Sequence, residues 1–161
     1  MKLAIVALSI CIALTAGSCL KQSTYSCNYD ACAVSAPAAE VQEVEAYLAA
    51  NNITGATKHC SGLYYKILEP GTGNNPTNCS VVAVAYKGML KNGSVFDQTA
   101  TPTALELTRV IKGWQNAIPL VKEGGKITIY IPPALGYGAS AVGPIPANSM
   151  LIFDVTLAGV R

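Results

Sequence analysis

The 161-residue sequence predicts an α+β domain in which one antiparallel sheet packs on one side against one short helix. Four segments between residues 63 and 157 alternate apolar and polar side chains, which is the period of a strand with one buried face. Between them, only Lys112 to Ile118 suits a helix. The length allows one domain of ordinary size with a leader, and not two domains.

The first eighteen residues have the form of a secretory signal peptide. Lys2 supplies a positive charge, Leu3 to Leu14 is apolar, and the small residues Ala16, Gly17 and Ser18 follow. An apolar run of about a dozen residues is too short to span a bilayer as a helix. We therefore expect residues 1–18 to be removed. One possibility is ordinary signal-peptide cleavage after Ser18. The other is lipoprotein processing, in which Cys19 is acylated and becomes the new N-terminus, because the sequence also resembles a bacterial lipobox ending at Cys19.

The number of cysteines favours lipidation of Cys19. Removal of the leader discards Cys11 and leaves five of the six thiols, so acylating Cys19 leaves an even set for disulfides in an oxidising compartment. Metal binding is the alternative for that set, but the spacings do not fit a tight zinc site. The four disulfide candidates are Cys27, Cys32, Cys60 and Cys79, and neither a metal nor another cofactor is expected.

Residues 19–58 are expected to form a linker with one amphipathic helix. Leu20 to Ala39 is rich in small and polar residues and predicts an irregular stalk. Glu40 to Ala50 has helical spacing, and Asn51, Asn52 and Gly55 end it. The helix is too short to hold a dimer alone, so we expect it to pack against its own domain. Its apolar residues are Val41, Val44 and Leu48.

Residues 59–161 are expected to form the folded domain. The helix at 112–118 ends near Pro119, and Gly124 and Gly125 begin the next connection. The apolar positions of the four strands are Leu63, Tyr65 and Ile67; Val82, Val84 and Tyr86; Ile127, Ile129 and Ile131; and Leu151, Phe153, Val155 and Leu157.

The charge pattern argues against nucleic acid as a partner. Only 12% of the residues are charged, the net charge is +2, and the basic residues are scattered. The single histidine, His59, lies at the junction between linker and domain, where we expect a structural or exposed role.

Five stretches combine aromatic and branched apolar side chains with the Asp97 carboxylate and the Tyr137 phenol, which suggests a small, dry site without a nucleophile and base. In chain order they read VAYKGML, GSVFDQT, RVIKGWQNAI, PALGYGAS and IPANSMLIFDVTL. This series closely resembles the FKBP family of peptidyl-prolyl cis-trans isomerases, which bind the macrolide tacrolimus. The resemblance extends from about Ser61 to Arg161.

The resemblance implies a half-barrel sheet wrapped over the short helix, and isomerisation of X-Pro bonds in exported, proline-containing polypeptides. It implies that Trp114 forms the pocket floor, that Asp97 places a fixed negative charge beside the twisting amide, and that Tyr137 and the Ile111 N–H hold substrate carbonyls. The walls are expected to comprise Tyr86, Phe96, Leu105, Val110, Ile111 and Phe153, with Ile145 closing one side.

Three departures from the family pattern concern the pocket rim. Thr103 and Leu105 stand where aromatics are frequent, and the expected loop from Gln98 to Thr101 lacks an arginine that some members have. These changes imply catalysis with reduced affinity for macrolides such as tacrolimus. The alternative function is a non-catalytic chaperone or scaffold module that holds proline-bearing segments.

The resemblance also implies a disulfide pattern and a location. In the FKBP topology we expect the strands beginning near Leu63 and Ser80 to start at the same sheet end, so that Cys60 meets Cys79 and Cys27 pairs with Cys32. The expected location is the cell envelope, in the periplasm or at the outer membrane, with a membrane anchor if Cys19 is acylated.

Overall fold

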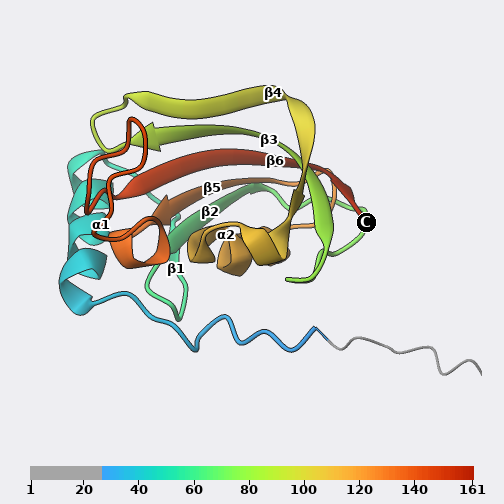
Figure 1. Ribbon diagram of the computed structural model, residues 1–161, viewed down its shortest axis with the longest axis horizontal. Coiled ribbons are helices and arrows are strands. Elements are labelled where there is room, and N and C mark those ends of the chain that lie inside the picture. The colour runs from blue at the N-terminus through green and yellow to red at the C-terminus, as the bar shows by residue number, and fades with distance from the viewer. Residues whose placement is uncertain (1–26) are drawn as a thin grey trace, which may run out of the picture.

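The computed structural model describes residues 27–161, and in them a six-stranded antiparallel sheet curves over a short helix (Figure 1). The strand order is β1-β2-β5-β6-β3-β4. The predicted signal peptide and Cys19 lie outside the described residues. The strands are β1 (Thr57–Lys58), β2 (Tyr64–Glu69), β3 (Val81–Leu90), β4 (Val95–Glu106), β5 (Lys126–Ile131) and β6 (Leu151–Val160).

The helices are α1 (Ala38–Ala50) and α2 (Lys112–Ala117). Short 3-10 turns cover Leu107–Arg109, Ile118–Leu120 and Pro133–Leu135. Both predicted helices are therefore present, and the α+β prediction is confirmed. Neither helix within residues 27–161 combines the length and the apolar character of a membrane span.

The main core lies between α2 and the concave face of the sheet. Ile127, Ile129 and Ile131 alternate toward it along β5 and are almost completely buried. Gly113 lets α2 approach this sheet, because a Cβ atom there would lie only 2.6 Å from side-chain atoms of Ile131. One expected core position is wrong: Ile67 is 40% exposed, beside a register shift between Ile67 and Glu69 at the end of β2.

Helix α1 covers the opposite face of the sheet at one end. Val44 and Leu48 pack there against Tyr130, Met150 and Ile152. Tyr130 belongs to this second cluster because neighbouring residues of β5 point to opposite faces. The helix thus packs against its own domain, as its short length led us to expect.

Strand β4 corrects the predicted loop from Gln98 to Thr101. These residues lie within a twelve-residue edge strand that pairs only with β3 in the sheet order. None of its side chains is buried, so the apolar alternation by which a strand is recognised in sequence is missing. Pro102 is tolerated because an edge strand leaves one row of N–H groups unpaired.

The disulfides are Cys27–Cys79 and Cys32–Cys60, so the predicted pairs Cys27–Cys32 and Cys60–Cys79 are wrong. The reason is strand direction. Strands β2 and β3 are separated by β5 and β6, and three successive antiparallel pairings leave them running in opposite directions. Their first residues therefore lie at opposite ends of the sheet.

The segment from Cys27 to Pro37 connects these two ends. It runs beneath α2 as an irregular chain (Figure 1), and one disulfide holds it near each end of the sheet. The described part of the predicted stalk is therefore fastened along the domain. His59 lies at this junction, where its Nδ1 atom is 2.8 Å from Ser61 Oγ, and burial lowers its pKa.

Candidate active site

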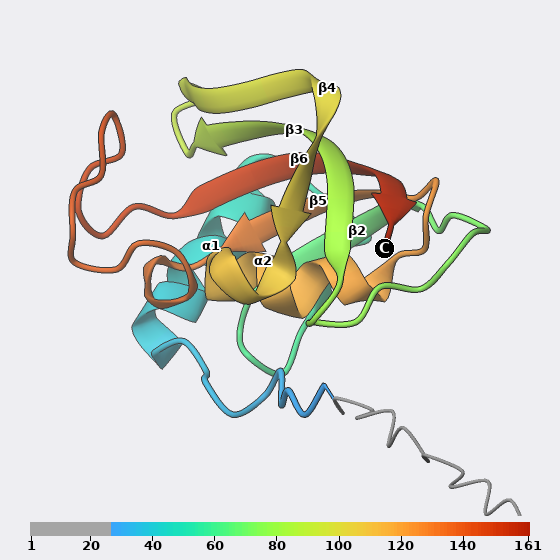
Figure 2. The same cartoon turned by 45° about the vertical axis from the view of Figure 1, so that its right-hand side comes forward.

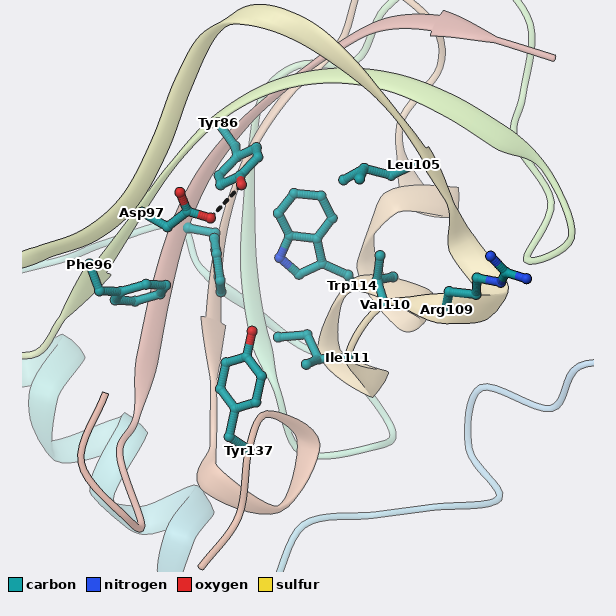
Figure 3. Close-up of a pocket in the computed structure, with 10 residues that line it drawn as sticks. Tyr86, Phe96, Asp97, Leu105, Arg109, Val110, Ile111, Trp114 and Tyr137 are labelled. Carbon is teal, nitrogen blue, oxygen red and sulfur yellow. Dashed lines mark hydrogen bonds between the residues drawn. The ribbon is translucent and has the colours of Figure 1, made fainter. Parts of the chain in front are cut away.

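A cavity of about 250 Å³ opens between α2 and the curved part of the sheet (Figure 3). Its position depends on the β3–β4 pair, which bends over α2 (Figure 2). Register shifts between Val84 and Tyr86 and between Gly88 and Met89 interrupt this pairing, and such bulges increase local twist. The lining residues are Tyr86, Phe96, Asp97, Leu105, Arg109, Val110, Ile111, Trp114, Tyr137 and Phe153.

Trp114 belongs to a cluster of four aromatic side chains that line the cavity. Its ring lies edge-on to Tyr86, with centroids 5.3 Å apart, and edge-on to Phe153 at 5.2 Å. Phe153 makes a third such contact with Phe96 at 5.4 Å. Each edge-to-face pair contributes about 0.5–1.5 kcal/mol beyond the burial of its area. The cluster therefore gives the cavity a fixed aromatic wall and floor.

A glycine makes this packing possible. A Cβ atom at Gly88, near the end of β3, would lie 2.7 Å from ring atoms of Phe96 and 2.8 Å from the ring of Phe153. Real Cβ atoms do not approach aromatic rings so closely, so any other residue there would displace both rings. The packing of Phe96 against Phe153 thus requires a residue without a Cβ atom at position 88 of β3.

The carboxylate of Asp97 is held by Tyr86. The Tyr86 hydroxyl on β3 donates a hydrogen bond of 2.5 Å to Oδ2 of Asp97 on β4 (Figure 3). Burial, and then this hydrogen bond, raise the pKa of Tyr86 to about 12. Tyr86 consequently remains a donor at neutral pH, and Asp97 keeps one orientation at the edge of the cavity.

Two further residues line the cavity from other elements. Ile111 is the residue that precedes the first turn of α2, and Tyr137 follows the 3-10 turn at Pro133–Leu135. Figure 3 shows the Tyr137 hydroxyl pointing into the cavity beside Ile111. Within residues 27–161 the Ile111 N–H makes no hydrogen bond to the protein.

The loop geometry behind Tyr137 depends on Gly138. This residue has a φ of +58°, which side chains disfavour, and its N–H donates to the Pro133 oxygen at 2.9 Å. Its own oxygen accepts from the Asn148 N–H at 2.8 Å. Both backbone polar groups of Gly138 are therefore hydrogen-bonded, which fixes the turn. The turn directs Tyr137 back over the cavity, although this side chain is 37% exposed.

The structure brings nine of the ten predicted pocket residues around one cavity. Ile145 is the exception: it is buried in the main core, is paired with Val142 in an isolated bridge, and does not line the cavity. Thr103 is exposed on β4 and is not among the lining residues, whereas Leu105 is.

Sequence reasoning missed Arg109 as a lining residue. It ends the 3-10 turn at Leu107–Arg109, where its Nε lies 3.0 Å from Glu106 Oε2, with 79% of its side chain exposed. A single basic residue beside Val110 carries no recognisable signal. The Tyr86–Asp97 hydrogen bond was also missed, since it depends on how β3 and β4 are paired.

Within residues 27–161 no group of three or more His, Cys, Asp or Glu side chains is placed to hold a metal ion.

Comparison with known proteins gives consistent results. Residues 73–158 match the model of the family described as FKBP-type peptidyl-prolyl cis-trans isomerase. The chain is 42% identical over 110 residues to the FKBP-type peptidyl-prolyl cis-trans isomerase FkpA of Escherichia coli K12, covering 66% of this chain and 41% of that protein. It is 42% identical over 125 residues to the peptidyl-prolyl cis-trans isomerase Mip of Coxiella burnetii, covering 74% and 54%. The chain thus spans about half the length of these relatives.

Solved structures agree. The crystal structure of FkpA from Escherichia coli has a TM-score of 0.69 and 37% identity, covering 77% of this chain and 58% of that chain. A peptidyl-prolyl cis-trans isomerase from Pseudomonas syringae pv. tomato has a TM-score of 0.68 and 31% identity, covering 80% and 98%. With the family model matched over more than half of its residues, this chain belongs to the FKBP-type peptidyl-prolyl cis-trans isomerase family.

Proposed function

We propose that this chain is a peptidyl-prolyl cis-trans isomerase that accelerates rotation about X-Pro bonds in exported polypeptides. The observation that carries the proposal is the convergence of an aromatic floor at Trp114, an Asp97 carboxylate held by Tyr86, and two free donors around one cavity. A planar amide is stabilised by resonance, and its rotation barrier is about 18–20 kcal/mol.

The cavity favours the twisted amide over the planar one. At the orthogonal transition state the resonance is lost and the amide dipole shrinks. Transfer from water to an apolar surface such as Trp114 therefore costs less desolvation free energy for the twisted amide than for the planar one. The Ile111 N–H and the Tyr137 hydroxyl hold the flanking carbonyls while Asp97 keeps a fixed charge beside the amide. Selective stabilisation of the twisted form speeds rotation without a covalent bond or a proton transfer.

Uncatalysed isomerisation takes tens of seconds or longer, so an exported isomerase would remove a slow step from folding. Two disulfides among the described residues support an oxidising compartment. The cavity rim formed by Leu105, in place of an aromatic, supports a preference for peptide substrates and weaker binding of macrolides such as tacrolimus.

The test of this function is an isomerisation assay on a short peptide with one X-Pro bond, repeated across pH. We expect turnover with a kcat/KM that is nearly flat from about pH 6 to 8.5, because no step moves a proton and Tyr86, with a pKa of about 12, stays protonated throughout. His59→Gln is the control and should leave the profile unchanged. A bell-shaped profile would contradict the mechanism, and absence of turnover with retained peptide binding would favour the non-catalytic module.

We also propose that Cys19, which lies outside the described residues, is diacylated and anchors the protein to a membrane of the cell envelope. Two acyl chains give stable attachment, whereas one chain is marginal. We expect wild-type protein to sediment with membranes and Cys19→Ser to be released or to remain unprocessed. Recovery of wild-type protein as a soluble species beginning with unmodified Cys19 would instead establish ordinary cleavage after Ser18.

A further inference from the structure

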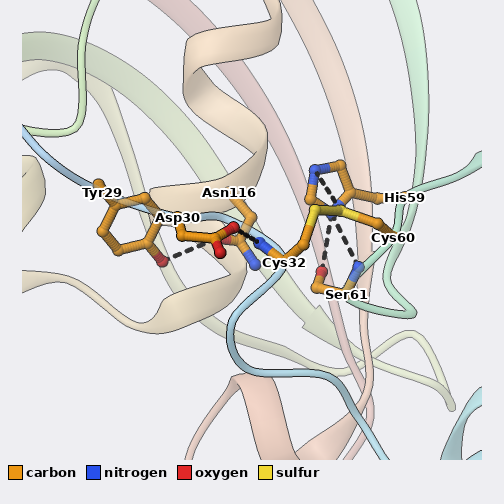
Figure 4. Close-up of a disulfide and its surroundings, with 7 residues drawn as sticks. All are labelled: Tyr29, Asp30, Cys32, His59, Cys60, Ser61 and Asn116. Atoms are coloured by element: carbon orange, nitrogen blue, oxygen red, sulfur yellow. Dashed lines mark hydrogen bonds between the residues drawn. A yellow bond between two sulfur atoms is a disulfide. The ribbon is translucent and has the colours of Figure 1, made fainter.

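The segment that the two disulfides hold makes direct contacts with α2, the helix that carries Trp114. The Tyr29 hydroxyl donates a hydrogen bond of 2.7 Å to Oδ1 of Asn116 (Figure 4). The Lys112 ammonium lies 5.3 Å from the centroid of the Tyr29 ring. Lys112 and Asn116 are four residues apart and share one face of the helix, so Tyr29 covers that face.

The contact with Asn116 is made at a buried position. Asn116 is 3% exposed, so water reaches its side chain poorly. If the Tyr29 hydroxyl were removed, Oδ1 of Asn116 would lose its hydrogen-bond donor at this buried position. Leaving a buried acceptor unpaired costs more than an exposed hydrogen bond contributes. Tyr29 therefore stabilises α2 through a specific hydrogen bond as well as by shielding it from solvent.

A second segment holds the same helix and is joined to the first. The side-chain amide of Asn78 donates to the backbone oxygen of Gln115. The next residue, Cys79, forms the disulfide with Cys27. One covalent bond thus ties together the two segments whose side chains contact neighbouring residues of α2.

Helix α2 needs external support. It has six residues, includes Gly113, and no side chain caps its N-terminus. A helix this short is not stable through its own hydrogen bonds. Its position nevertheless determines the site, because Trp114 lies on it and Gln115 Nε2 donates to the Val110 oxygen at 2.8 Å, directly before Ile111.

We propose that Tyr29 is a positioning residue for the isomerase site, acting through Asn116 and α2 on the floor at Trp114 and on the N–H of Ile111. The Cys27–Cys79 and Cys32–Cys60 disulfides keep Tyr29 in place from both sides. This inference rests on the proposed function for its activity readout, and has a second readout that does not. Trp114 is the only tryptophan in the chain, so its fluorescence reports the pocket floor directly.

The decisive variant is Tyr29→Phe, with Tyr64→Phe as matched control. Tyr64 donates a hydrogen bond of the same 2.7 Å length, to Glu45, on the side of the sheet that α1 covers. We expect Tyr29→Phe to lower kcat/KM by about three- to tenfold, the size expected for one lost hydrogen bond, and to shift the Trp114 emission. Tyr64→Phe should change neither, under conditions where urea titration shows both variants to be fully folded.

The Cys27→Ser/Cys79→Ser variant removes the disulfide on one side of Tyr29 without altering Tyr29 itself, and should shift the Trp114 emission in the same direction. Wild-type emission and kcat/KM in a folded Tyr29→Phe protein would overturn the proposal, as would equal losses in Tyr29→Phe and Tyr64→Phe. An inactive wild-type protein would refute the proposed function alone, and the emission of the variants would still decide whether Tyr29 positions the helix.

Discussion

Replacing Trp114 with alanine is expected to lower kcat/KM for a prolyl peptide by roughly a hundredfold or more, which corresponds to about 2.7 kcal/mol of transition-state stabilisation. The substitution removes the floor of the cavity and both edge-to-face contacts, with Tyr86 and Phe153. Because Trp114 is buried, we also expect the free energy of unfolding to fall by about 3–5 kcal/mol. Activity and urea denaturation must therefore be measured on the same preparation.

Trp114→Phe is the matched control for this prediction. It keeps an aromatic floor and removes the indole Nε1, which is buried and has no hydrogen-bond partner among the described residues. No protein hydrogen bond is lost, so we expect Trp114→Phe to retain far more activity than Trp114→Ala. Wild-type turnover by a folded Trp114→Ala protein would show that the floor of the cavity lies elsewhere.

Removing either disulfide is expected to destabilise the domain by about 3–4 kcal/mol in the chain-entropy model of cross-linking. The two bonds connect residues 52 and 28 positions apart, so each closes a long loop in the unfolded chain. The variants are Cys27→Ser/Cys79→Ser and Cys32→Ser/Cys60→Ser, compared by urea denaturation without reductant. Because one loop lies within the other, the two losses need not add.

Peptide mapping without reduction tests the pairing itself. Cleavage at Tyr29 or Asp30 separates Cys27 from Cys32, and cleavage at Lys66 separates Cys60 from Cys79. We expect linked peptides that contain Cys27 with Cys79 and Cys32 with Cys60. A Cys27–Cys32 link, or a double Cys→Ser variant as stable as wild type, would contradict the arrangement in which the N-terminal segment is held beneath α2.

The sequence alone determined those features that depend on local periodicity. Alternation of apolar residues identified β5 and β6, and helical spacing of Val41, Val44 and Leu48 identified α1 and the face that it buries. The resemblance to the FKBP family implied ten pocket residues, and nine of them lie around one cavity. The elements could be predicted because each depends on neighbours along the chain, and the pocket residues could be indicated because they follow the motif order of a known family.

Tertiary structure decided what depends on how strands are ordered and paired. Strand β4 has no buried side chain and so no alternation to detect, and it exists because β3 offers an edge to pair with. The disulfides follow from β2 and β3 running in opposite directions, which is known only once β5 and β6 are placed between them. The Tyr86–Asp97 bond needs the bulged register of β3 and β4, and the contact of Tyr29 with Asn116 joins residues 87 positions apart. Such contacts leave no trace in local sequence because each partner can be recognised only after the chain has brought the two together.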